Sequence, residues 1–440
     1  MIARTMLDPQ FLPPELARDA LTGLPDLETA RARLELWSKA HEGESPATVH
    51  ALLLGLQRFD TINLAYGAAT GDAVLAEVAA TLSHFAASEL DGHWLAARGG
   101  GGSFLLVADE ACSRERWQFF AEQLAERIAR PMARTGGGSL RLSPRIALLC
   151  GLPGEGAESV LDRLAQTLTS VQRQQGRRIA WADGEALRAG RTAAQLEADL
   201  LDTIDRDEIE IVYQPQFSLA DDRLVGAEAL ARWNHPALGR IGAGTLFAVA
   251  ERMDYVAQLS SHIAMRALAG ARDWPEHLRL SLNVTPSDLA SGSFADEFRA
   301  VLAESGFPPR RLTLEVTEQV LLSDIQVASA ELGRLAGDGI RIALDDFGAG
   351  FCNFRYLKLL PLHYLKLDRS MIDGIGEDPR DLAVLRAIVA MAHALELAVI
   401  VEGVEVEEQR QLVAREGCAL YQGFLRAHPM SSAALVALAS

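Results

Sequence analysis

Seven polar residues in the second half of this 440-residue chain stand at or near the ends of short apolar runs. They are Glu228, Asn283, Glu315, Asp345, Lys366, Glu402 and Gln422. Hard divalent cations prefer oxygen ligands such as carboxylates and amide carbonyls. Four carboxylates, two amides and a lysine in one place therefore predict divalent-metal and phosphate chemistry, provided that the fold gathers them.

The runs that carry these residues have the composition of buried parallel strands. Most are apolar on both faces and rich in Val, Ile and Leu, and helical segments separate them. The runs are Leu224–Leu230, Leu278–Val284, Leu312–Val316, Ile340–Asp346, Tyr364–Leu367, Val399–Glu402 and Ala419–Phe424. A barrel of such strands brings their carboxyl ends together around one mouth. The second half is therefore predicted to be a TIM-like (β/α)8 barrel.

The composition is that of an ordinary globular protein. A hydrophobic fraction of 49% with 23% charged residues excludes a disordered chain. The four cysteines form no CxxC pair, so they predict neither a disulfide framework nor a zinc site. A membrane helix of roughly 20 apolar residues and a signal-peptide core are both missing. We therefore expect a cytoplasmic protein without membrane insertion.

The formal net charge is −17. Such a charge opposes nonspecific binding to DNA, RNA or an anionic membrane. An anionic ligand would need local compensation by metal ions or by a well-placed Arg or Lys.

The chain divides near residue 190, and residues 15–182 read as a separate domain. Strands and helices alternate irregularly there, and a hairpin is expected around the glycine run Gly99–Gly102, which predicts an α+β fold with a two-layer sheet and helices. The expected strands are Ala51–Leu56, Ser139–Cys150 and Arg178–Trp181, and the expected helices are Gly71–Ala86, Arg114–Ala129 and Ala157–Gln174.

Residues 183–207 are predicted to form a helix that joins the two domains. Their apolar residues fall on one stripe of a helix, namely Leu187, Ala194, Leu196, Leu200, Leu201 and Ile204. Two alternatives stay open, because the helix could pack on one domain or form a signalling or dimerising rod.

Seven motifs in fixed order give the second half a family resemblance. They are AEALARW at Ala227–Trp233, NVTPSDL at Asn283–Leu289, LEVTE at Leu314–Glu318, LDDFGAGF at Leu344–Phe351, LKLD at Leu365–Asp368, VEGVE at Val401–Glu405 and YQGF at Tyr421–Phe424. Together they resemble the EAL family of cyclic di-GMP phosphodiesterases, with the domain expected over residues 208–435. Taken singly, each residue also suits a solvated loop or a turn; the complete ordered set favours the site.

The resemblance implies a site with two Mg²⁺ or Mn²⁺ ions. Glu228, Asn283, Glu315 and Asp345 are expected to hold one ion. Asp345 would bridge to the second ion, which Asp346 and Glu402 would also hold. Lys366 would orient or deprotonate the attacking water, and Gln422 would hold that water or a metal-bound one.

Further roles follow from the same resemblance. Glu318, the second glutamate of its motif, is expected in the catalytic machinery. Arg232 resembles the phosphate-binding arginine, since a guanidinium fork suits a pair of phosphodiester oxygens. The other expected substrate-binding residues are Gln214, Leu230, Pro286, Asp368 and Glu405.

One departure concerns the loop after Asp346. Cys352 replaces a serine that the family uses to anchor this loop to the glutamate at Glu318, and a thiol is a weak hydrogen-bond donor. We therefore expect an active site with a modified gate. The family also implies a homodimer through this loop and the helices after it.

Three motifs in the first half resemble the GGDEF family of diguanylate cyclases over residues 17–182. They are DALTGLPD at Asp19–Asp26, INLAYGAATGD at Ile62–Asp72 and ARGGGGSF at Ala97–Phe104. The carboxylates of the signature are missing at Gly102 and Ser103, and Gly55 replaces the aspartate of the first strand. Cyclase activity is therefore predicted to be absent, because nothing would hold its two metal ions.

Recognition of a nucleotide base is the part of cyclase chemistry that the first half retains. Asn63 and Asp72 match the family positions that read guanine, and the glycine run could approach phosphates through backbone N–H groups. This domain could bind GTP and regulate its neighbour. In the alternative, Asn63 caps a helix or turn, Asp72 caps a helix that starts at Ala73, and the domain is structural or dimerising. No sensor module is recognisable, so the sequence does not identify the input signal, unless it is GTP or a partner protein.

The whole chain is thus predicted to hydrolyse cyclic di-GMP to linear pGpG under control of an inactive cyclase-like domain. The alternative is a receptor or scaffold that binds cyclic di-GMP without turnover and signals through partners. Such receptors typically lose part of the motif set, which this chain keeps. A bifunctional cyclase and phosphodiesterase is disfavoured by the missing carboxylates.

Overall fold

The computed structural model describes residues 18–40, 49–57, 59–110, 112–133, 139–150, 155–173, 178–183, 193–204, 206–290, 292–317, 325–348, 356–372, 375 and 379–439. The chain forms two compact units. The first comprises Met1–Thr192 with the short segment His235–Arg240, and the second comprises Ala193–Asn234 with Ile241–Ser440. Each unit is described by itself.

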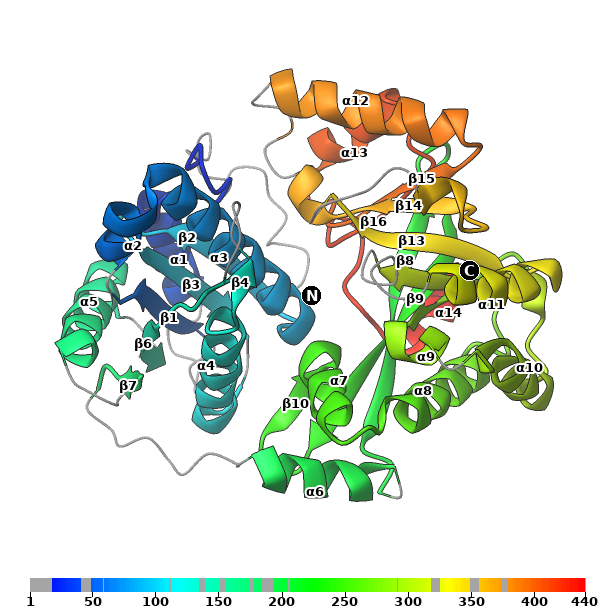
Figure 1. The fold of residues 1–440 in the computed structure, drawn as a ribbon, viewed down its shortest axis with the longest axis horizontal. Helices are drawn as coiled ribbons and strands as arrows, with labels where there is room; N and C mark the ends of the chain where they lie inside the picture. Colours follow the sequence, from blue (N-terminus) through cyan, green and yellow to red (C-terminus); the bar gives the residue numbers. More distant parts are fainter. Residues whose placement is uncertain are drawn as a thin grey trace. The chain divides into compact units, whose positions relative to one another are not determined.

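The first unit is built on a five-stranded sheet with strand order β2-β3-β1-β6-β7 (Figure 1). Its strands are β1 (Val49–Leu56), β2 (His93–Arg98), β3 (Ser103–Asp109), β6 (Pro144–Cys150) and β7 (Ile179–Trp181), and a small pair is formed by β4 (Met132–Ala133) and β5 (Ser139–Leu140). Its helices are α1 (Leu27–Ala40), α2 (Phe59–Tyr66), α3 (Ala68–Glu89), α4 (Arg114–Ile128) and α5 (Ala157–Arg173). The α+β fold expected here is confirmed.

Helices cover both faces of this sheet, so the expectation of two layers is wrong. Leu52 and Leu54 of β1 join a core with α3 and α4, whereas Ala51 joins a second core with α1 and α5. A strand with apolar residues on both faces needs cover on both sides. The strand expected over Ser139–Cys150 is also divided, because β6 begins only at Pro144, and proline is tolerated at the first residue of a strand.

The second unit contains a closed eight-stranded barrel. Its strands are β8 (Ile209–Ser218), β9 (Leu224–His235), β11 (Arg279–Val284), β12 (Leu312–Thr317), β13 (Arg341–Phe347), β14 (Tyr364–Leu367), β15 (Ala398–Val401) and β16 (Leu420–Gln422), with β10 (Gly239–Gly242) added beside β9. Strands β9 and β11 to β16 pair in parallel along this order. The seven apolar runs of the sequence all correspond to barrel strands.

Strand β8 departs from a (β/α)8 barrel because it runs antiparallel to both of its neighbours, β9 and β16. The segment between β8 and β9 is a short turn that includes Asp222 at φ 58°. Strands joined by so short a connection must run antiparallel, since a parallel crossover needs a dozen or more residues. The predicted barrel is thus confirmed, with a hairpin in place of its first strand–helix unit.

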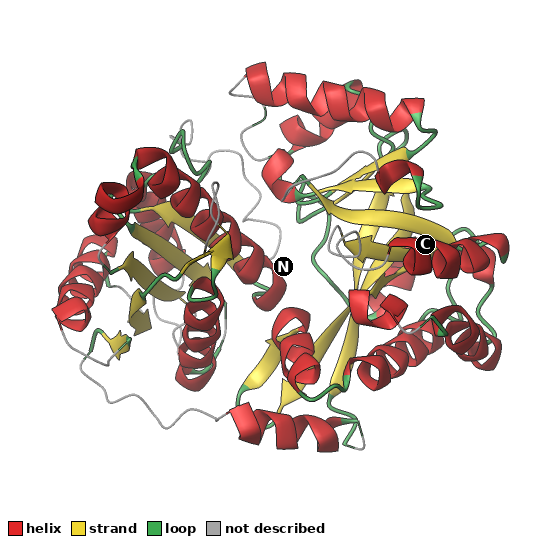
Figure 2. Ribbon diagram, viewed as in Figure 1, coloured by secondary structure: helices red, strands yellow, loops and turns green. Residues whose placement is uncertain are grey.

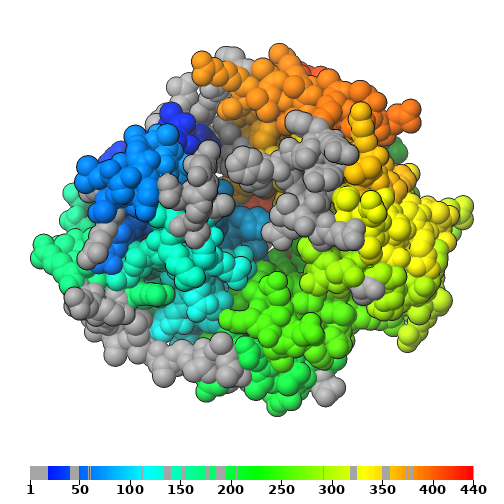
Figure 3. All heavy atoms as spheres, viewed as in Figure 1, coloured from blue at the N-terminus to red at the C-terminus, as the bar shows by residue number. Residues whose placement is uncertain are grey.

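Helices enclose the barrel strands on the outside (Figure 2). They are α7 (Ala243–Arg252), α8 (Val256–Gly270), α9 (Pro286–Ala290), α10 (Phe294–Ser305), α11 (Ile325–Gly337), α12 (Pro379–Ala394), α13 (Glu407–Arg415) and α14 (Ser432–Ala439). The space-filling view shows α12 at the surface of this unit (Figure 3). Strand residues such as Leu314, Leu344 and Leu365 are fully buried beneath the helices.

Helix α6 (Ala193–Thr203) is the described part of the predicted joining helix, and it packs against α7 of the barrel unit. Leu196 and Leu200 are buried. At the end of α6, the Thr203 hydroxyl contacts the Glu208 carboxylate, which also accepts a hydrogen bond from Trp233 Nε1 at 3.1 Å. These contacts favour the alternative in which the helix packs on one domain.

Among the residues that the structure describes, no helix is long and apolar enough to cross a membrane.

Candidate active site

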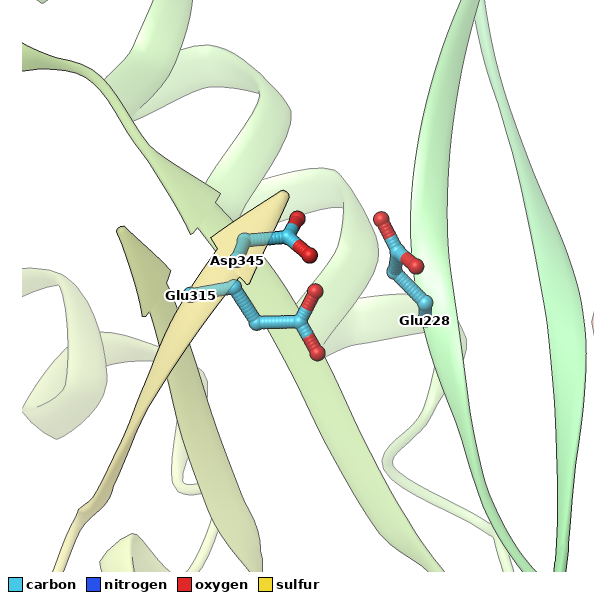
Figure 4. Close-up of side chains that lie close together, drawn as sticks. All are labelled: Glu228, Glu315 and Asp345. Atoms are coloured by element: carbon cyan, nitrogen blue, oxygen red, sulfur yellow. The ribbon is translucent and has the colours of Figure 1, made fainter. Parts of the chain in front are cut away.

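The carboxylates of Glu228, Glu315 and Asp345 point toward one another inside the barrel (Figure 4). They come from β9, β12 and β13, and one oxygen of each lies within 4.8 Å of the others. All three side chains are buried. The strand register explains why they meet. Glu228 is the last residue of β9 paired with β11, and on β11 Asn283 lies opposite Glu315.

A second acidic group shares Asp345 and adds Asp346 and Glu402. Successive residues of a regular strand point to opposite faces, so adjacent aspartates reach one site only where the backbone departs from that geometry. Asp346 has φ 56°, in the left-handed region, and the pairing of β13 with β14 shifts at a bulge between Leu344 and Phe347. Bulges re-aim side chains in this way beside functional sites.

Lys366 on β14 lies among these carboxylates and has no exposed surface. Its Nζ is 3.2 Å from Glu228 Oε2, 2.9 Å from Asp345 Oδ1 and 2.7 Å from Glu402 Oε1, and it also contacts Glu315. Burial opposes its charge, but the carboxylates outweigh burial and raise the pKa of Lys366 well above its usual range. One ammonium cannot neutralise four carboxylates, so the site retains an excess of negative charge.

Crowding moves the pKa values of the four carboxylates in different directions. Burial and the neighbouring charge of Glu228 raise the pKa of Glu315 to about 8. Burial also raises the pKa of Asp345, and it raises the pKa of Glu402 well above its usual range. Burial acts likewise on Glu228, but the lysine charge and amide hydrogen bonds outweigh it and lower the pKa of this carboxyl. The site therefore favours cations.

Amide groups complete the site. Asn283 Nδ2 donates to Glu228 Oε1 at 2.7 Å. Gln422 Nε2 donates to Glu228 Oε2 and to Glu402 Oε1, both at 2.9 Å. Gln422 Oε1 in turn accepts a hydrogen bond from Gln216 Nε2 at 3.0 Å.

The residues fit divalent cations. Every acidic ligand in the two groups is a carboxylate oxygen, the ligand type that Mg²⁺ and Mn²⁺ prefer. Glu315 Oε1 is buried and has no hydrogen-bond partner. Leaving such an atom unpaired costs free energy, which a bound cation would offset. The two groups are therefore acidic clusters suited to metal binding.

The expected substrate-binding residues of β9 follow Glu228 along one face of the strand. Leu230 and Arg232 are two and four residues further on, which places Arg232 about 13 Å along the strand. Beyond Glu228, β9 leaves β11 and pairs with β8 as far as Trp233. Arg232 is buried and donates to the carbonyl oxygen of Ala231 at 3.0 Å.

Four other predicted substrate residues lie on nearby elements. Gln214 lies opposite Glu228 on β8 and donates to the Ala427 carbonyl at 3.0 Å. Pro286 is the first residue of α9, directly after the β11 strand that carries Asn283. Asp368 follows β14, and its N–H donates to the Phe347 carbonyl at 3.2 Å. Glu405 is exposed and forms an ion pair with Arg369 at 2.6 Å.

Glu318 and Cys352 lie outside the described residues, so the predicted contact between them stays a prediction. Gln216, by contrast, was not singled out from the sequence and reaches Gln422 directly. Its signal was its spacing, because it follows Gln214 by two residues on the same strand and so faces the same side.

The signature hairpin of the first unit has no carboxylate at the cyclase positions. Gly55 of β1 lies opposite Ser103 of β3, so two of the missing carboxylates would have been neighbours. A Cβ at Gly102 would lie 2.9 Å from Phe59 Cβ. Phe59 thus occupies the space that a side chain at position 102 would need, so the packing of this unit is adapted to the missing carboxylates.

The two predicted base-reading residues have different surroundings. Asn63 lies within α2, and its Oδ1 is buried without a hydrogen-bond partner. Asp72 is exposed and lies inside α3, which begins at Ala68. The alternative in which Asp72 caps a helix beginning at Ala73 is therefore wrong, because the helix starts five residues earlier.

Two family models match the chain in sequence order. The diguanylate cyclase GGDEF domain matches residues 16–179, and the EAL domain matches residues 197–429. The chain is a tandem GGDEF–EAL protein. Curated relatives match almost the full length of this GGDEF–EAL chain. An uncharacterized protein of Mycobacterium tuberculosis is 31% identical over 423 residues, covering 95% of this chain and 67% of the relative.

The cyclic di-GMP phosphodiesterase NbdA of Pseudomonas aeruginosa is also 31% identical to this GGDEF–EAL protein, over 87% of this chain and 49% of the relative. The chain spans about half to two thirds of the length of the curated relatives it matches.

Among solved structures, the PaMucR phosphodiesterase in complex with cyclic di-GMP is 33% identical, with a TM-score of 0.52. This match covers 55% of the GGDEF–EAL chain and 99% of the PaMucR chain. The match to a solved GGDEF–EAL structure of Vibrio cholerae LapD covers 93% of this chain and 95% of the LapD chain, with a TM-score of 0.54. At 16% identity, that likeness shows the fold alone.

Proposed function

We propose that this protein hydrolyses cyclic di-GMP to linear pGpG at a two-metal site in its EAL barrel. The observation that carries the proposal is the pair of acidic groups that share Asp345 and lie around the buried Lys366. Relatives named as cyclic di-GMP phosphodiesterases, and a solved phosphodiesterase complex with that dinucleotide, support the choice of substrate.

Each acidic group would hold one Mg²⁺ or Mn²⁺ ion. Glu228, Glu315 and Asp345 would hold the first, with Asn283 beside them, and Asp345, Asp346 and Glu402 would hold the second. Bound ions at such a site supply positive charge that activates water and neutralises a phosphodiester.

The chain's own residues position the reactants. Lys366 would orient the attacking water, since its ammonium already reaches both acidic groups. Of the two roles expected from the resemblance, deprotonation of the water does not suit a charged ammonium, which has no free lone pair. Gln422 donates to one carboxylate of each group and would hold the same water in line. Arg232 would bind phosphate oxygens through its guanidinium. Water would add across one P–O3′ bond, leaving a 5′-phosphate and a free 3′-hydroxyl.

The direct test is to incubate the purified protein with cyclic di-GMP and Mg²⁺ or Mn²⁺ and to follow pGpG by chromatography. Glu228→Ala should abolish the product, because it removes a carboxylate that contacts Lys366, Asn283 and Gln422. Glu251→Ala, on the exposed face of α7, is the matched control and should leave turnover unchanged.

Unchanged turnover in Glu228→Ala would refute the metal assignment. Tight binding of cyclic di-GMP without pGpG in either metal would establish the alternative, a receptor or scaffold.

The second proposal concerns the GGDEF unit, which we propose binds GTP and regulates the barrel without cyclase activity. The supporting observation is the unpaired, buried Oδ1 of Asn63, an acceptor for a base N–H. GTP should change pGpG production by the wild-type protein, whereas Asn63→Ala should abolish that response. No response to GTP in the wild type would leave this unit a structural or dimerising role.

A further inference from the structure

Gln216 on β8 is a buried polar residue at the inner wall of the barrel. It lies directly opposite Gln422 in the antiparallel pairing of β8 with β16. Residues paired in this way place their side chains on the same face of the sheet. Its Nε2 donates to Gln422 Oε1 at 3.0 Å, across 206 residues of sequence. Among the described residues, Gln216 donates to Gln422 and not to the acidic residues, so its effect on them passes through Gln422.

The hydrogen bonds of Gln422 fix the sense in which its amide must point. Its Nε2 donates to Glu228 Oε2 and to Glu402 Oε1, so the NH₂ group faces these two carboxyl groups. The carbonyl oxygen then faces Gln216, which supplies the donor that this oxygen requires. Each end of the amide thus faces a group of the complementary hydrogen-bonding type. Rotation of the amide by 180° would place its oxygen against the carboxylate oxygens and its NH₂ group against the NH₂ group of Gln216.

A cation bound to the carboxylates would change this balance. It would take carboxylate lone pairs that now accept from Gln422, and it would attract an amide oxygen as a further ligand. A rotated Gln422 would present its oxygen to the acidic groups and could no longer donate there. The hydrogen bond from Gln216 opposes that rotation from the opposite side of Gln422.

We propose that Gln216 is a positioning residue, which holds the Gln422 amide with its NH₂ group toward the two acidic groups and its oxygen away from them. The inference rests on the proposed hydrolysis of cyclic di-GMP. Gln216 acts through Gln422 and touches neither the substrate nor the reacting atoms. Partners that orient the residues of a metal site in this way are typically worth tenfold to a hundredfold in activity.

The test is a double-mutant cycle with Gln216→Met, Gln422→Met and the double variant. Methionine keeps the length of the side chain and removes the amide. Gln216→Met should lower kcat for pGpG formation by roughly tenfold to a hundredfold and leave KM unchanged, because it displaces a group near the water and none at the substrate. Gln216→Met should cause no further loss when Gln422 is already Met.

The same cycle is read without metal or substrate through the melting temperature of the protein in a chelator. Gln216→Met should lower the melting temperature of the wild type but should not lower that of Gln422→Met any further, since the hydrogen bond between the two residues is already missing there. Gln118→Met is the matched control. Gln118 is also buried and bridges two side chains, Glu122 and Trp181, but it lies in the GGDEF unit. It should leave kcat unchanged.

The outcomes separate this inference from the function on which it rests. Absence of pGpG with the wild-type protein refutes the proposed hydrolysis. Wild-type turnover with an unchanged kcat in Gln216→Met refutes the positioning role. Independent, multiplicative losses of kcat from the two substitutions would also refute it, since they would show that Gln216 acts elsewhere.

Discussion

The Lys366 ammonium faces more negative charge than it can neutralise. Four carboxylates surround it, and none of its surface reaches solvent. Removal of the only buried cation from such a group leaves uncompensated charge, which typically costs about 3–5 kcal/mol of stability. Under the proposed function, metal ions would therefore share with the lysine the compensation of the carboxylate charge.

We expect Lys366→Met to lower the melting temperature of the metal-free protein and to abolish pGpG formation. Mg²⁺ or Mn²⁺ should raise the melting temperature of this variant more than that of the wild type, because the ions replace the missing positive charge. Thermal unfolding with a chelator and with each metal measures both effects. Lys358→Met, at an exposed lysine, is the control. Equal responses of variant and wild type to metal would contradict the shared role.

His50 provides a pH dependence in the GGDEF unit. Its ring is buried against Trp117, and its Nδ1 is 3.1 Å from Cys150 Sγ. Burial lowers the pKa of His50 to about 4, from 6.5 in the unfolded chain. The unfolded state therefore binds more protons between these values. The stability that the neutral, buried His50 contributes is fully present above pH 6.5 and is lost progressively as the pH falls to about 4.

The expected loss from this residue is about 2–3 kcal/mol by pH 4.5, since one pKa unit corresponds to about 1.4 kcal/mol. Urea unfolding at pH 7 and pH 4.5 should show a smaller loss for His50→Asn than for the wild type. His93→Asn, at an exposed histidine of the same unit, should keep the wild-type loss. An identical pH dependence in His50→Asn would show that other groups account for it.

Most residues of the candidate site could be predicted from the sequence, because each of them lies inside a motif that its neighbouring residues make recognisable. Glu228, Glu315 and Asp345 could be assigned to strands from apolar runs alone, although Glu228 lies in the middle of β9. Gln216 could not, since its importance depends on a strand partner 206 residues away. The pairing of β8 with β16 decides that contact, and no local pattern encodes it.

At the scale of elements, local patterns predicted strands well and connections less well. The run Tyr364–Leu367 coincides with β14 because buried apolar residues mark its whole length. The orientation of β8 could not be read from its residues, since antiparallel pairing follows from the short turn after it. The helices on both faces of β1 were not predicted, because a short strand that is apolar on both faces was also compatible with the expected two-layer arrangement.

Helix α6 tests how closely the joining segment belongs to the barrel unit. Leu200 is fully buried and Leu201, its neighbour, is 51% exposed. Leu200→Ala should lower the free energy of unfolding of the barrel unit by about 2–5 kcal/mol, the usual effect of a cavity in a core. Leu201→Ala should change it by less than about 0.5 kcal/mol. Chemical denaturation of the two variants checks the difference.

Similar small effects from both leucines would contradict the packing of α6 on α7. A large effect from Leu201→Ala alone would instead support a second copy of the chain on the exposed face of the helix.

At the scale of the whole molecule, the two units have separate hydrophobic cores. Leu52 and Ala51 of β1 belong to the cores of the GGDEF unit, and Leu344 of β13 belongs to the core of the barrel. Separate cores permit separate unfolding, for which a single free energy of unfolding is not defined. We therefore expect two transitions in calorimetry.

Cyclic di-GMP in the presence of a chelator should raise only the transition of the barrel, by RT ln(1 + [L]/Kd) in free energy. That transition is identified independently as the one that Leu200→Ala lowers. The melting temperature of the other transition, that of the GGDEF unit, should depend on pH in the wild type and depend on it less in His50→Asn. A single cooperative transition that cyclic di-GMP shifts as a whole would contradict independent units.

The position of β8 between β9 and β16 has a consequence for synthesis of the protein. The first strand of the barrel closes the ring only when it meets the last one, so contacts between distant parts of the chain complete the structure. Such topologies fold slowly, and domains form as the ribosome releases them. A nascent chain that ends before Leu420 has every acidic residue of the site and an open barrel. The barrel would therefore close only after β16 has been synthesised, and copies that end before β16 would lack a complete site.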